Sequence, residues 1–240
     1  MGLVVPAILP TSHDDLREKL ALFARLPSVD RVQIDVVDGR FASPASWPYT
    51  AAAEFRKMVE RGEMLPETQH LEYEMDLMCF DAEEVAGDWL ALGASHLILH
   101  AESVTDPARL LASLRKRYGG GADIELPALV SLGLALNIAS DIALIEPCLG
   151  AVDYVQFMGI ADIGKQGQPF DRRALEKVRV FRSRHPEVVV QVDGGISLET
   201  AKEFLALGVS SLVVGSAILH APDPAAALAA FEALQSPFGV

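Results

Sequence analysis

The sequence has little of what marks several classes of protein. Only 2 of its 240 residues are cysteine, and Cys79 and Cys148 stand in unrelated contexts, which excludes a disulfide framework and the CxxC spacing of zinc sites. No apolar run approaches the length of a membrane-spanning helix, and Pro6 and Pro10 interrupt the first one. We therefore expect a cytoplasmic protein with reduced cysteines that does not associate with a membrane.

Positive charge is also scarce. The chain has 20 lysine and arginine residues against 33 aspartate and glutamate residues, which gives a formal net charge of -13. Such a surface repels nucleic acid and anionic membranes, so neither is expected as a partner. An anionic ligand such as a phosphate would need a local site of backbone N–H groups and helix dipoles, because the overall field opposes its binding.

The chain does have many short apolar segments that alternate with longer amphipathic ones. The apolar segments are rich in Val, Ile and Leu and mostly lack the alternation of a half-exposed sheet, a pattern typical of parallel strands covered by helices. We expect strands at 3–9, 31–36, 71–77, 96–101, 128–136, 152–158, 188–193 and 211–215. We expect helices at 14–26, 49–61, 81–92, 106–118, 140–147, 171–184, 197–207 and 223–234.

Eight strand–helix units in this length predict an α/β protein with a single (β/α)8 barrel, the TIM barrel, as one domain over residues 1–240. A doubly wound open sheet has fewer strands and carries its phosphate-binding glycines in the first turn. Here the first turn, residues 9–14, contains no glycine. In barrels of this type the functional residues stand at the carboxyl ends of the strands.

Carboxylates stand near three of these strand ends. Gln33 and Asp35 are two residues apart on the second expected strand, so they face the same side. Asp76 lies near the end of the third strand and Asp193 at the end of the seventh. Each carboxylate could cap a following loop, but carboxylates inside apolar strands are costly unless they are paired, hydrogen-bonded or metal-bound. Three at one edge favour a shared site. His100 ends the fourth strand, either as a pocket residue or as a hydrogen-bonded strand histidine.

Glycine-bearing turns follow the last two strands, where many barrels bind phosphate with backbone N–H groups. Tight turns also use glycine, but the pairing of the two turns favours a phosphate site. The long loop at 158–170 has further glycines that suit a backbone cradle or a mobile lid. The expected phosphate-binding residues are Gly164, Gly167, Gly194, Gly195, Gly215 and Ser216.

Taken in order, these motifs resemble those of the ribulose-phosphate 3-epimerase family along nearly the whole chain. Six segments carry the resemblance, with this chain's letters first and the family's pattern second: 6–9 (PAIL; P-S-I-L), 34–41 (IDVVDGRF; V-D-V-M-D-G-x-F), 76–78 (DLM; H-L-M), 100–102 (HAE; H-x-E), 136–137 (LN; L-N-P) and 158–170 (MGIADIGKQGQPF; M-S-V-x-P-G-F-G-G-Q-x-F). Two more, 192–196 (VDGGI) and 215–218 (GSAI), match the family closely. The last two recur in several phosphate-binding barrels, so the ordered set is the more specific signal.

The resemblance implies a ribulose-phosphate-binding type of barrel and an isomerase of carbohydrate metabolism that interconverts pentulose 5-phosphates at C3. It implies that Asp35 and Asp193 lie on opposite faces of the sugar. One removes the C3 proton and the other returns a proton from the far side, because inversion needs delivery to the opposite face. The enediolate intermediate between these steps needs electrostatic stabilisation. Met78, His100 and Met158 are expected in the substrate pocket.

The sequence departs from the family at the metal site. The family holds a divalent ion with two histidines and two aspartates, and here Gln33 and Asp76 stand at the histidine positions. In one interpretation, which we favour at this point, Gln33, Asp35, Asp76 and Asp193 hold one divalent ion, Mg²⁺ or Mn²⁺ rather than Zn²⁺. In the other, no metal binds, the carboxylates repel one another, and at least one has a raised pKa that suits a general acid.

Other functions stay open beside the epimerase. A related enzyme could act on a different phosphosugar. A lyase or decarboxylase of this fold often places a lysine beside the acid of the second strand, and Asp35-Val-Val-Asp38 contains none. A non-catalytic sugar-phosphate binder would not need two opposed carboxylates. We expect an epimerase or isomerase of a phosphorylated ketose, with the sugar phosphate as its partner and no organic cofactor; the resemblance is compatible with a homo-oligomer.

Overall fold

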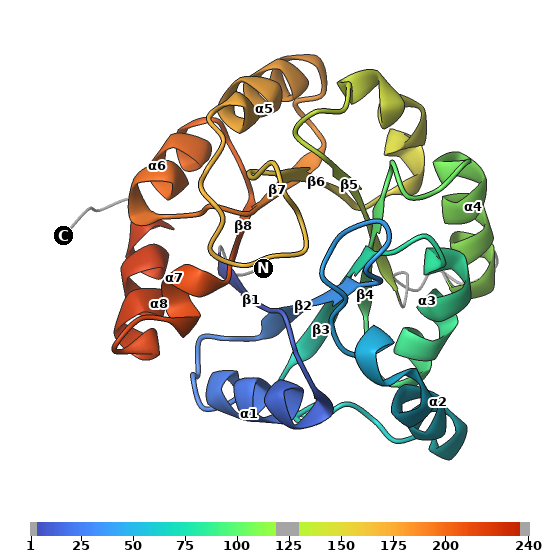
Figure 1. Cartoon of the computed structure of the whole chain (residues 1–240). Helices are drawn as coiled ribbons and strands as arrows, with labels where there is room; N and C mark the ends of the chain where they lie inside the picture. Colours follow the sequence, from blue (N-terminus) through green and yellow to red (C-terminus); the bar gives the residue numbers. More distant parts are fainter. Residues whose placement is uncertain (1–3, 119–129, 236–240) are drawn as a thin grey trace.

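Eight parallel strands close into a barrel in which each strand pairs with its sequence neighbours and the last pairs with the first (Figure 1). The computed structural model describes residues 4–118 and 130–235. The strands are β1 (Val4–Ile8), β2 (Arg31–Val37), β3 (Glu72–Met78), β4 (His96–His100), β5 (Ser131–Leu136), β6 (Tyr154–Met158), β7 (Val189–Asp193) and β8 (Ser211–Val214). The expected (β/α)8 fold is confirmed.

Helices form a ring around this barrel (Figure 1). They are α1 (His13–Phe23), α2 (Ala52–Arg61), α3 (Ala82–Ala91), α4 (Pro107–Tyr118), α5 (Arg173–Arg184), α6 (Leu198–Ala206), α7 (Ser216–Leu219) and α8 (Pro224–Glu232). Side chains set several of their starts: the hydroxyl of Ser197 accepts from the backbone N–H of Thr200, whose own hydroxyl accepts from the N–H of Ser197. None of the helices described is long and apolar enough to cross a membrane.

One expected helix is wrong. Residues 140–147 do not form an α-helix; the chain there makes two 3-10 turns, η2 (Ile142–Leu144) and η3 (Glu146–Ala151). Pro147 accounts for the break: it lacks the N–H that would continue an α-helix from the preceding turn, and it stands in the first turn of η3, where that N–H is not needed. Two smaller differences concern short elements. A 3-10 turn, η1 (Tyr49–Ala51), precedes α2, and the four-residue helix α7 was not expected.

Parts of two expected strands, residue 3 and residues 128–129, lie outside the described residues. The described parts of both expectations overlap β1 and β5 to within one residue at one end. That residues 1–240 form one domain stays a prediction.

The main hydrophobic core fills the space between the strands and the helices. An aromatic cluster of Trp47, Phe55 and Trp89 stands out in it, with ring centroids 4.7 Å apart for Phe55 and Trp89 and 5.8 Å apart for the two tryptophans. Trp47 belongs to the loop after β2, and its backbone N–H donates to the carbonyl of Pro10 after β1. The core thereby fixes the loop that leaves the functional end of β2.

The inside of the barrel carries many polar side chains beside small apolar clusters, in contrast to this core. Fully buried side chains on the inward faces include Gln33, Glu74, Asp76, Gln156 and Gln191. Strand register sets their levels: Gln33 is level with Glu74 in the β2–β3 pair, and Gln156 with Gln191 in the β6–β7 pair. Because buried polar groups must find partners within the protein, these residues are expected to contact one another across the barrel.

Replacing Trp89 by alanine tests the aromatic cluster. The side chain is fully buried, so Trp89→Ala leaves a cavity that we expect to lower the free energy of unfolding by about 3–5 kcal/mol. Urea unfolding followed by circular dichroism measures this loss. Leu144→Ala, at a side chain that is 42% exposed, is the control and is expected to change stability by less than about 0.5 kcal/mol. Equal effects of the two variants would contradict the assigned core.

Candidate active site

Three carboxylates meet at the carboxyl ends of the strands. Asp35 on β2 is level with Asp76 on β3, and Asp193 is the last residue of β7. One ligand oxygen from each lies within 4.8 Å of the other two. Asp76 is fully buried and Asp35 is 9% exposed. The structure thus brings together the three acids that the sequence placed at strand ends, here called the acidic cluster.

The carboxamide of Gln33 bridges two members of the acidic cluster. Its Nε2 donates to Oδ1 of Asp35 at 2.8 Å and to Oδ2 of Asp193 at 3.1 Å. Its Oε1 is buried and has no hydrogen-bond partner among the described residues. Gln33 therefore joins β2 to β7, which are separated in the barrel by β8 and β1.

Both oxygens of Asp76 also have hydrogen-bond partners. Oδ1 lies 3.0 Å from Nε2 of His100, and Oδ2 accepts from Nε2 of Gln156 at 3.0 Å. Burial alone would lower the pKa of His100, but the charge of Asp76 and its hydrogen bond outweigh burial and raise this pKa. The pairing with Asp76 thus favours the protonated form of the imidazole, while Nδ1 of His100 is buried without a hydrogen-bond partner among the described residues.

A chain of buried side chains supports Gln156 from below. Nε2 of Gln191 donates to Oε1 of Gln156 at 2.9 Å and to Oε1 of Glu74 at 2.7 Å. The other oxygen of Glu74 accepts from the hydroxyl of Tyr154 at 2.8 Å and lies 3.5 Å from Nη1 of Arg31. The orientation of Gln156 is fixed, because its oxygen accepts from Gln191 while its nitrogen donates to the acidic cluster.

Sequence reasoning missed this buried network. The available signal was the recurrence of polar residues two apart within apolar strands: Glu74 with Asp76 on β3, and Tyr154 with Gln156 on β6. A spacing of two places both side chains on one face of a strand, and a polar pair on a strand of a covered barrel must face inward.

Burial and mutual repulsion raise the pKa values of Asp35 and Asp193, the two carboxyl groups that Gln33 bridges. Burial raises the pKa of Asp35 well above its ordinary value, and the charges of Asp193 and Asp76 raise it further. Burial and the charge of Asp76 raise the pKa of Asp193 to about 7, against the opposing hydrogen bond from Gln33. The two groups titrate together, because the charge of each affects the other, and both shifts favour protonation of the pair.

A cleft with about 510 Å³ of empty volume, part of it open to solvent, lies at this end of the barrel. Asp35 and Asp193 line it, together with the apolar side chains of Met78 and Met158. All the glycines and the serine expected to bind phosphate also line it: Gly164, Gly167, Gly194, Gly195, Gly215 and Ser216.

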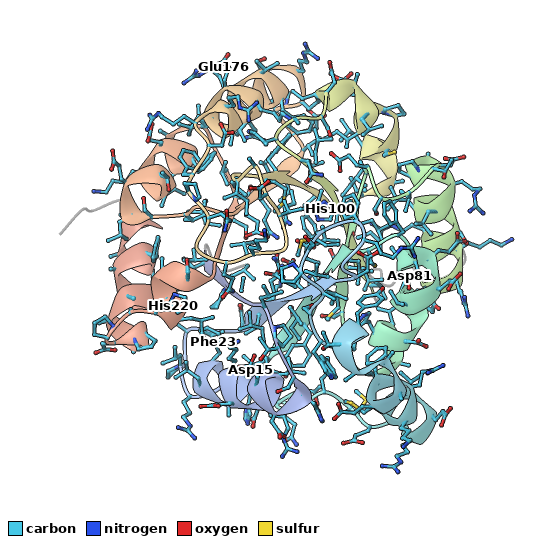
Figure 2. All side chains as sticks on the ribbon, in the orientation of Figure 1. Asp15, Phe23, Asp81, His100, Glu176 and His220 are labelled. Atoms are coloured by element: carbon cyan, nitrogen blue, oxygen red, sulfur yellow. The ribbon has the colours of Figure 1, made fainter. Side chains whose placement is uncertain are left out.

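His100, expected in the pocket, lies behind it. Its side chain is fully buried and contacts Asp76, and its ring packs 5.2 Å from that of Phe41. Figure 2 shows His100 inside the ring of helices, whereas Asp15 and Glu176 lie on the ring. The alternative of a hydrogen-bonded strand histidine describes it better, because its ring is fully buried, bonds to Asp76 and does not line the cleft.

Close backbone contacts shape the glycine turns. Gly194 and Gly195 have φ values of +100° and +68°, and a Cβ on Gly195 would lie 2.7 Å from Cα of Phe170. Gly159, one of the loop glycines expected to form a cradle or lid, is packed on this turn: a Cβ there would lie 2.2 Å from the carbonyl oxygen of Gly194. Its N–H donates to the carbonyl of Asp193 at 2.6 Å, so the loop after β6 packs directly on the turn after β7.

The loop between β6 and α5 crosses the mouth of the barrel, and the loop between β2 and α2 lies on the other side of the mouth (Figure 1). Nε2 of Gln166 fastens the first loop by donating to the carbonyl of Ala7 on β1 at 3.1 Å. Lys165 also lines the cleft. Gln166 also lies against the turn after β8, where a Cβ on Gly215 would be 2.8 Å from its Nε2, whereas Gly164 packs on Ala42 of the β2–α2 loop.

Comparison with known proteins now decides the family. A model of the ribulose-phosphate 3-epimerase family matches residues 3–219. The chain belongs to the ribulose-phosphate 3-epimerase family. It is 27% identical over 227 residues to a ribulose-phosphate 3-epimerase of Aquifex aeolicus (strain VF5), covering 93% of this chain and 92% of that one. It is 29% identical over 240 residues to that of Mycobacterium leprae (strain TN), covering 96% and 93%.

Solved structures with the same fold include 3-hexulose-6-phosphate synthase from Salmonella typhimurium, with a TM-score of 0.67, 17% identity and coverage of 96% of this chain and 97% of that one. KGPDC from Streptococcus mutans has a TM-score of 0.68, 19% identity and coverage of 97% and 96%. At these identities the likeness shows the barrel fold alone. Membership of the ribulose-phosphate 3-epimerase family confirms the resemblance and the expectation of a carbohydrate epimerase.

The acidic cluster is a group that could hold a cation, but its neighbours do not fit one well. Gln33 stands where the family has a metal-binding histidine and was expected to be a ligand. Its amide nitrogen, however, faces Asp35 and Asp193. An N–H group repels a cation, whereas a carboxamide ligates through its oxygen. The oxygens of Asp76 are likewise occupied by an amide N–H and an imidazole. In this arrangement Gln33 is a hydrogen-bond donor to the cluster rather than a fourth ligand.

Replacing Tyr154 by phenylalanine tests the buried network while keeping the ring. Tyr154→Phe removes the hydroxyl that donates to Glu74 and leaves a buried carboxylate oxygen with a weaker set of donors. We expect the free energy of unfolding to fall by about 1–3 kcal/mol in urea titrations. A double-mutant cycle with Glu74→Gln should show a clear coupling energy between the two positions. Strict additivity would contradict the contact.

Proposed function

We propose that the protein is a 3-epimerase of a phosphorylated ketose, with D-ribulose 5-phosphate as its first candidate substrate. The observation that carries the proposal is that Asp35 and Asp193 line one cleft from two separate strands, beside glycine turns suited to a phosphate. The curated relatives named above carry the name ribulose-phosphate 3-epimerase, which supports this choice of substrate.

Proton transfer between two faces of the sugar needs one carboxylate and one carboxylic acid at the same time. Burial and mutual repulsion produce this state, because they raise the pKa of Asp35 far and that of Asp193 to about 7. Ionised Asp193 removes the C3 proton from one face, and protonated Asp35 delivers a proton to the other. Afterwards Asp193 holds a proton and Asp35 is ionised, so the pair is set for the reverse reaction.

The intermediate adds little net charge to the site. When Asp193 takes the C3 proton, its negative charge passes to the enediolate, so the total charge in the cleft stays constant. Gln33 donates to both carboxylates and is therefore adjacent to whichever one is ionised. His100 beside Asp76 keeps the third carboxylate paired during the transfer.

The phosphate of the substrate is proposed to bind at the turns after β7 and β8 and the loop after β6. Their lining residues are Gly164, Gly167, Gly194, Gly195, Gly215 and Ser216. Backbone N–H groups in such turns attract an anion even on a protein with a net charge of -13. Met78 and Met158 form apolar walls around the sugar.

The sequence predicts which ion would suit this site and that no organic cofactor is needed. For any ion that the acidic cluster takes up, Mg²⁺ or Mn²⁺ is preferred over Zn²⁺, since the ligand atoms there are carboxylate oxygens. The mechanism proposed above has no step that passes through such an ion. A proton transfer between two carboxylates also needs no organic cofactor.

The remaining expectations about the setting stay predictions. They are a cytoplasmic location, a homo-oligomeric state, and the absence of nucleic acid and membrane partners. The acidic surface supports the last of these.

Proton NMR in D2O tests the proposed function directly. D-ribulose 5-phosphate incubated with the protein should lose its C3 proton signal while deuterated xylulose 5-phosphate appears. A folded protein that binds the substrate but causes neither change would remove this substrate. Parallel samples with phosphohexuloses then distinguish a related enzyme from a non-catalytic binder.

Asparagine variants test the two-base mechanism. Asp35→Asn and Asp193→Asn each keep the size of the side chain but remove one proton carrier, so interconversion should fall by about 100- to 10,000-fold. Each variant should still exchange the C3 proton with solvent from one epimer only, and the two variants should differ in which epimer. Exchange from both epimers in a single variant would show that one group serves both faces.

Alanine variants of glycine test the phosphate turns. Gly195→Ala puts a Cβ into the backbone of Phe170 and penalises the left-handed conformation, so KM should rise roughly tenfold or more. The value of kcat should change less, since the acid–base pair is untouched. Gly150→Ala is the matched control, because nothing lies within 4 Å of its Cβ. An unchanged KM in Gly195→Ala would place the phosphate elsewhere.

A further inference from the structure

The amide nitrogen of Gln33 bonds to both of the proposed proton carriers, Asp35 and Asp193. This Nε2 group has two hydrogens, and both are used: one bond of 2.8 Å to Asp35 and one of 3.1 Å to Asp193. Carboxylates brought this close need a group that attracts both. We propose that the carboxamide of Gln33 replaces a metal ion in this site, so that the protein moves the C3 proton without a metal. The catalytic half of this inference rests on the proposed function.

The orientation of the Gln33 amide is the first observation that argues against a bound cation. A cation between Asp35 and Asp193 would attract the oxygen of Gln33 and repel its N–H hydrogens. With the oxygen facing the carboxylates and no cation between them, three acceptor groups would meet with no donor. The observed orientation, nitrogen toward both carboxylates, is the one that satisfies the pair by hydrogen bonds alone.

The hydrogen bonds of Asp76, the other changed ligand position, are the second such observation. Its Oδ1 is held by His100 and its Oδ2 by Gln156. Gln156 cannot turn its oxygen toward the cluster without losing the bond from Gln191 to that oxygen. Asp76 is thus committed to the protein's own donors by a network that continues to Glu74.

The two changed positions therefore act together. Gln33 supplies an N–H donor where a ligand would be needed, and Asp76 pairs with a buried histidine rather than with an ion. Gln33 is a positioning residue in this arrangement: it holds the oxygens of Asp35 and Asp193 at fixed places and leaves the proton transfer to them.

Metal content and metal dependence test the inference separately. The purified wild-type protein is dialysed with and without EDTA, and its Mg, Mn, Fe, Co and Zn contents are measured by elemental mass spectrometry. Calorimetric titration with Mn²⁺ follows on the same samples. The rate of C3 hydrogen exchange with D-ribulose 5-phosphate in D2O is then compared between them. We expect far less than one ion per chain, no saturable Mn²⁺ binding, and exchange rates equal within about twofold.

A Gln33→Glu variant turns the site into one that needs a cation. The change keeps the shape of the side chain but replaces the N–H donor by a fourth carboxylate oxygen, so the variant should bind Mn²⁺ and its Tm should rise when Mn²⁺ is added. Gln69→Glu makes the same chemical change at an exposed position and is the matched control. It should match the wild type in metal content and in Tm with and without Mn²⁺.

The outcomes separate this inference from the proposed function. A stoichiometric ion in the wild type, saturable Mn²⁺ binding by it, or loss of exchange in EDTA would each overturn the replacement of the metal by Gln33. Absence of exchange in every sample, from a protein that binds no ion, would instead refute the proposed function and leave the metal-free site supported. The wild-type measurements decide the inference even if Gln33→Glu fails to fold.

Discussion

Three carboxylates held within 4.8 Å of one another at the mouth of a closed barrel are the constraint on which the rest of the site depends. Buried carboxylates this close together are stable only when hydrogen-bond donors surround them or when some of them are protonated. The protein supplies the donors from three directions: Gln33 from β2, Gln156 from β6 and His100 from β4. Burial and repulsion also raise the pKa of both Asp35 and Asp193, which favours their protonated forms. Two carboxyl groups of raised pKa therefore line one cleft, which is the arrangement that the proposed acid–base pair needs.

The barrel makes this arrangement stable by continuing the polar network into its interior. Glu74, Tyr154 and Gln191 form a layer below the acidic cluster, and their bonds fix the amide that holds Asp76. Outside the strands, the aromatic cluster around Trp89 holds the loop that begins where β2 ends. The glycine turns complete the cleft, because Gly159 and Gly195 allow the loop after β6 to pack against the turn after β7.

Much of this can be predicted from the sequence. Buried parallel strands are near-continuous apolar runs, so the pattern predicts all eight, and Asp35 and Asp193 stand out as carboxylates near the ends of such runs. The apolar pattern at 140–147 predicts a helix that Pro147 prevents, and α7 is too short to show a period. The partners of Gln33 and Gln156 cannot be predicted, since a strand pattern gives the face of a side chain but not its contact across a barrel. The sequence assigns His100 to the pocket or to a structural bond with equal reason, and only its distance to Asp76 decides between them.

The central claim is that Asp35 and Asp193, joined by the amide of Gln33 rather than by an ion, stand on either side of the reacting carbon. X-ray diffraction from crystals grown with Mn²⁺ and a pentulose 5-phosphate, recorded at a wavelength where manganese scatters anomalously, tests it most directly. The account predicts C3 between the two carboxylates, the phosphate on the turns after β7 and β8, and no anomalous peak in the acidic cluster. An anomalous peak between Asp35 and Asp193, or a sugar whose C3 lies away from both, would contradict it.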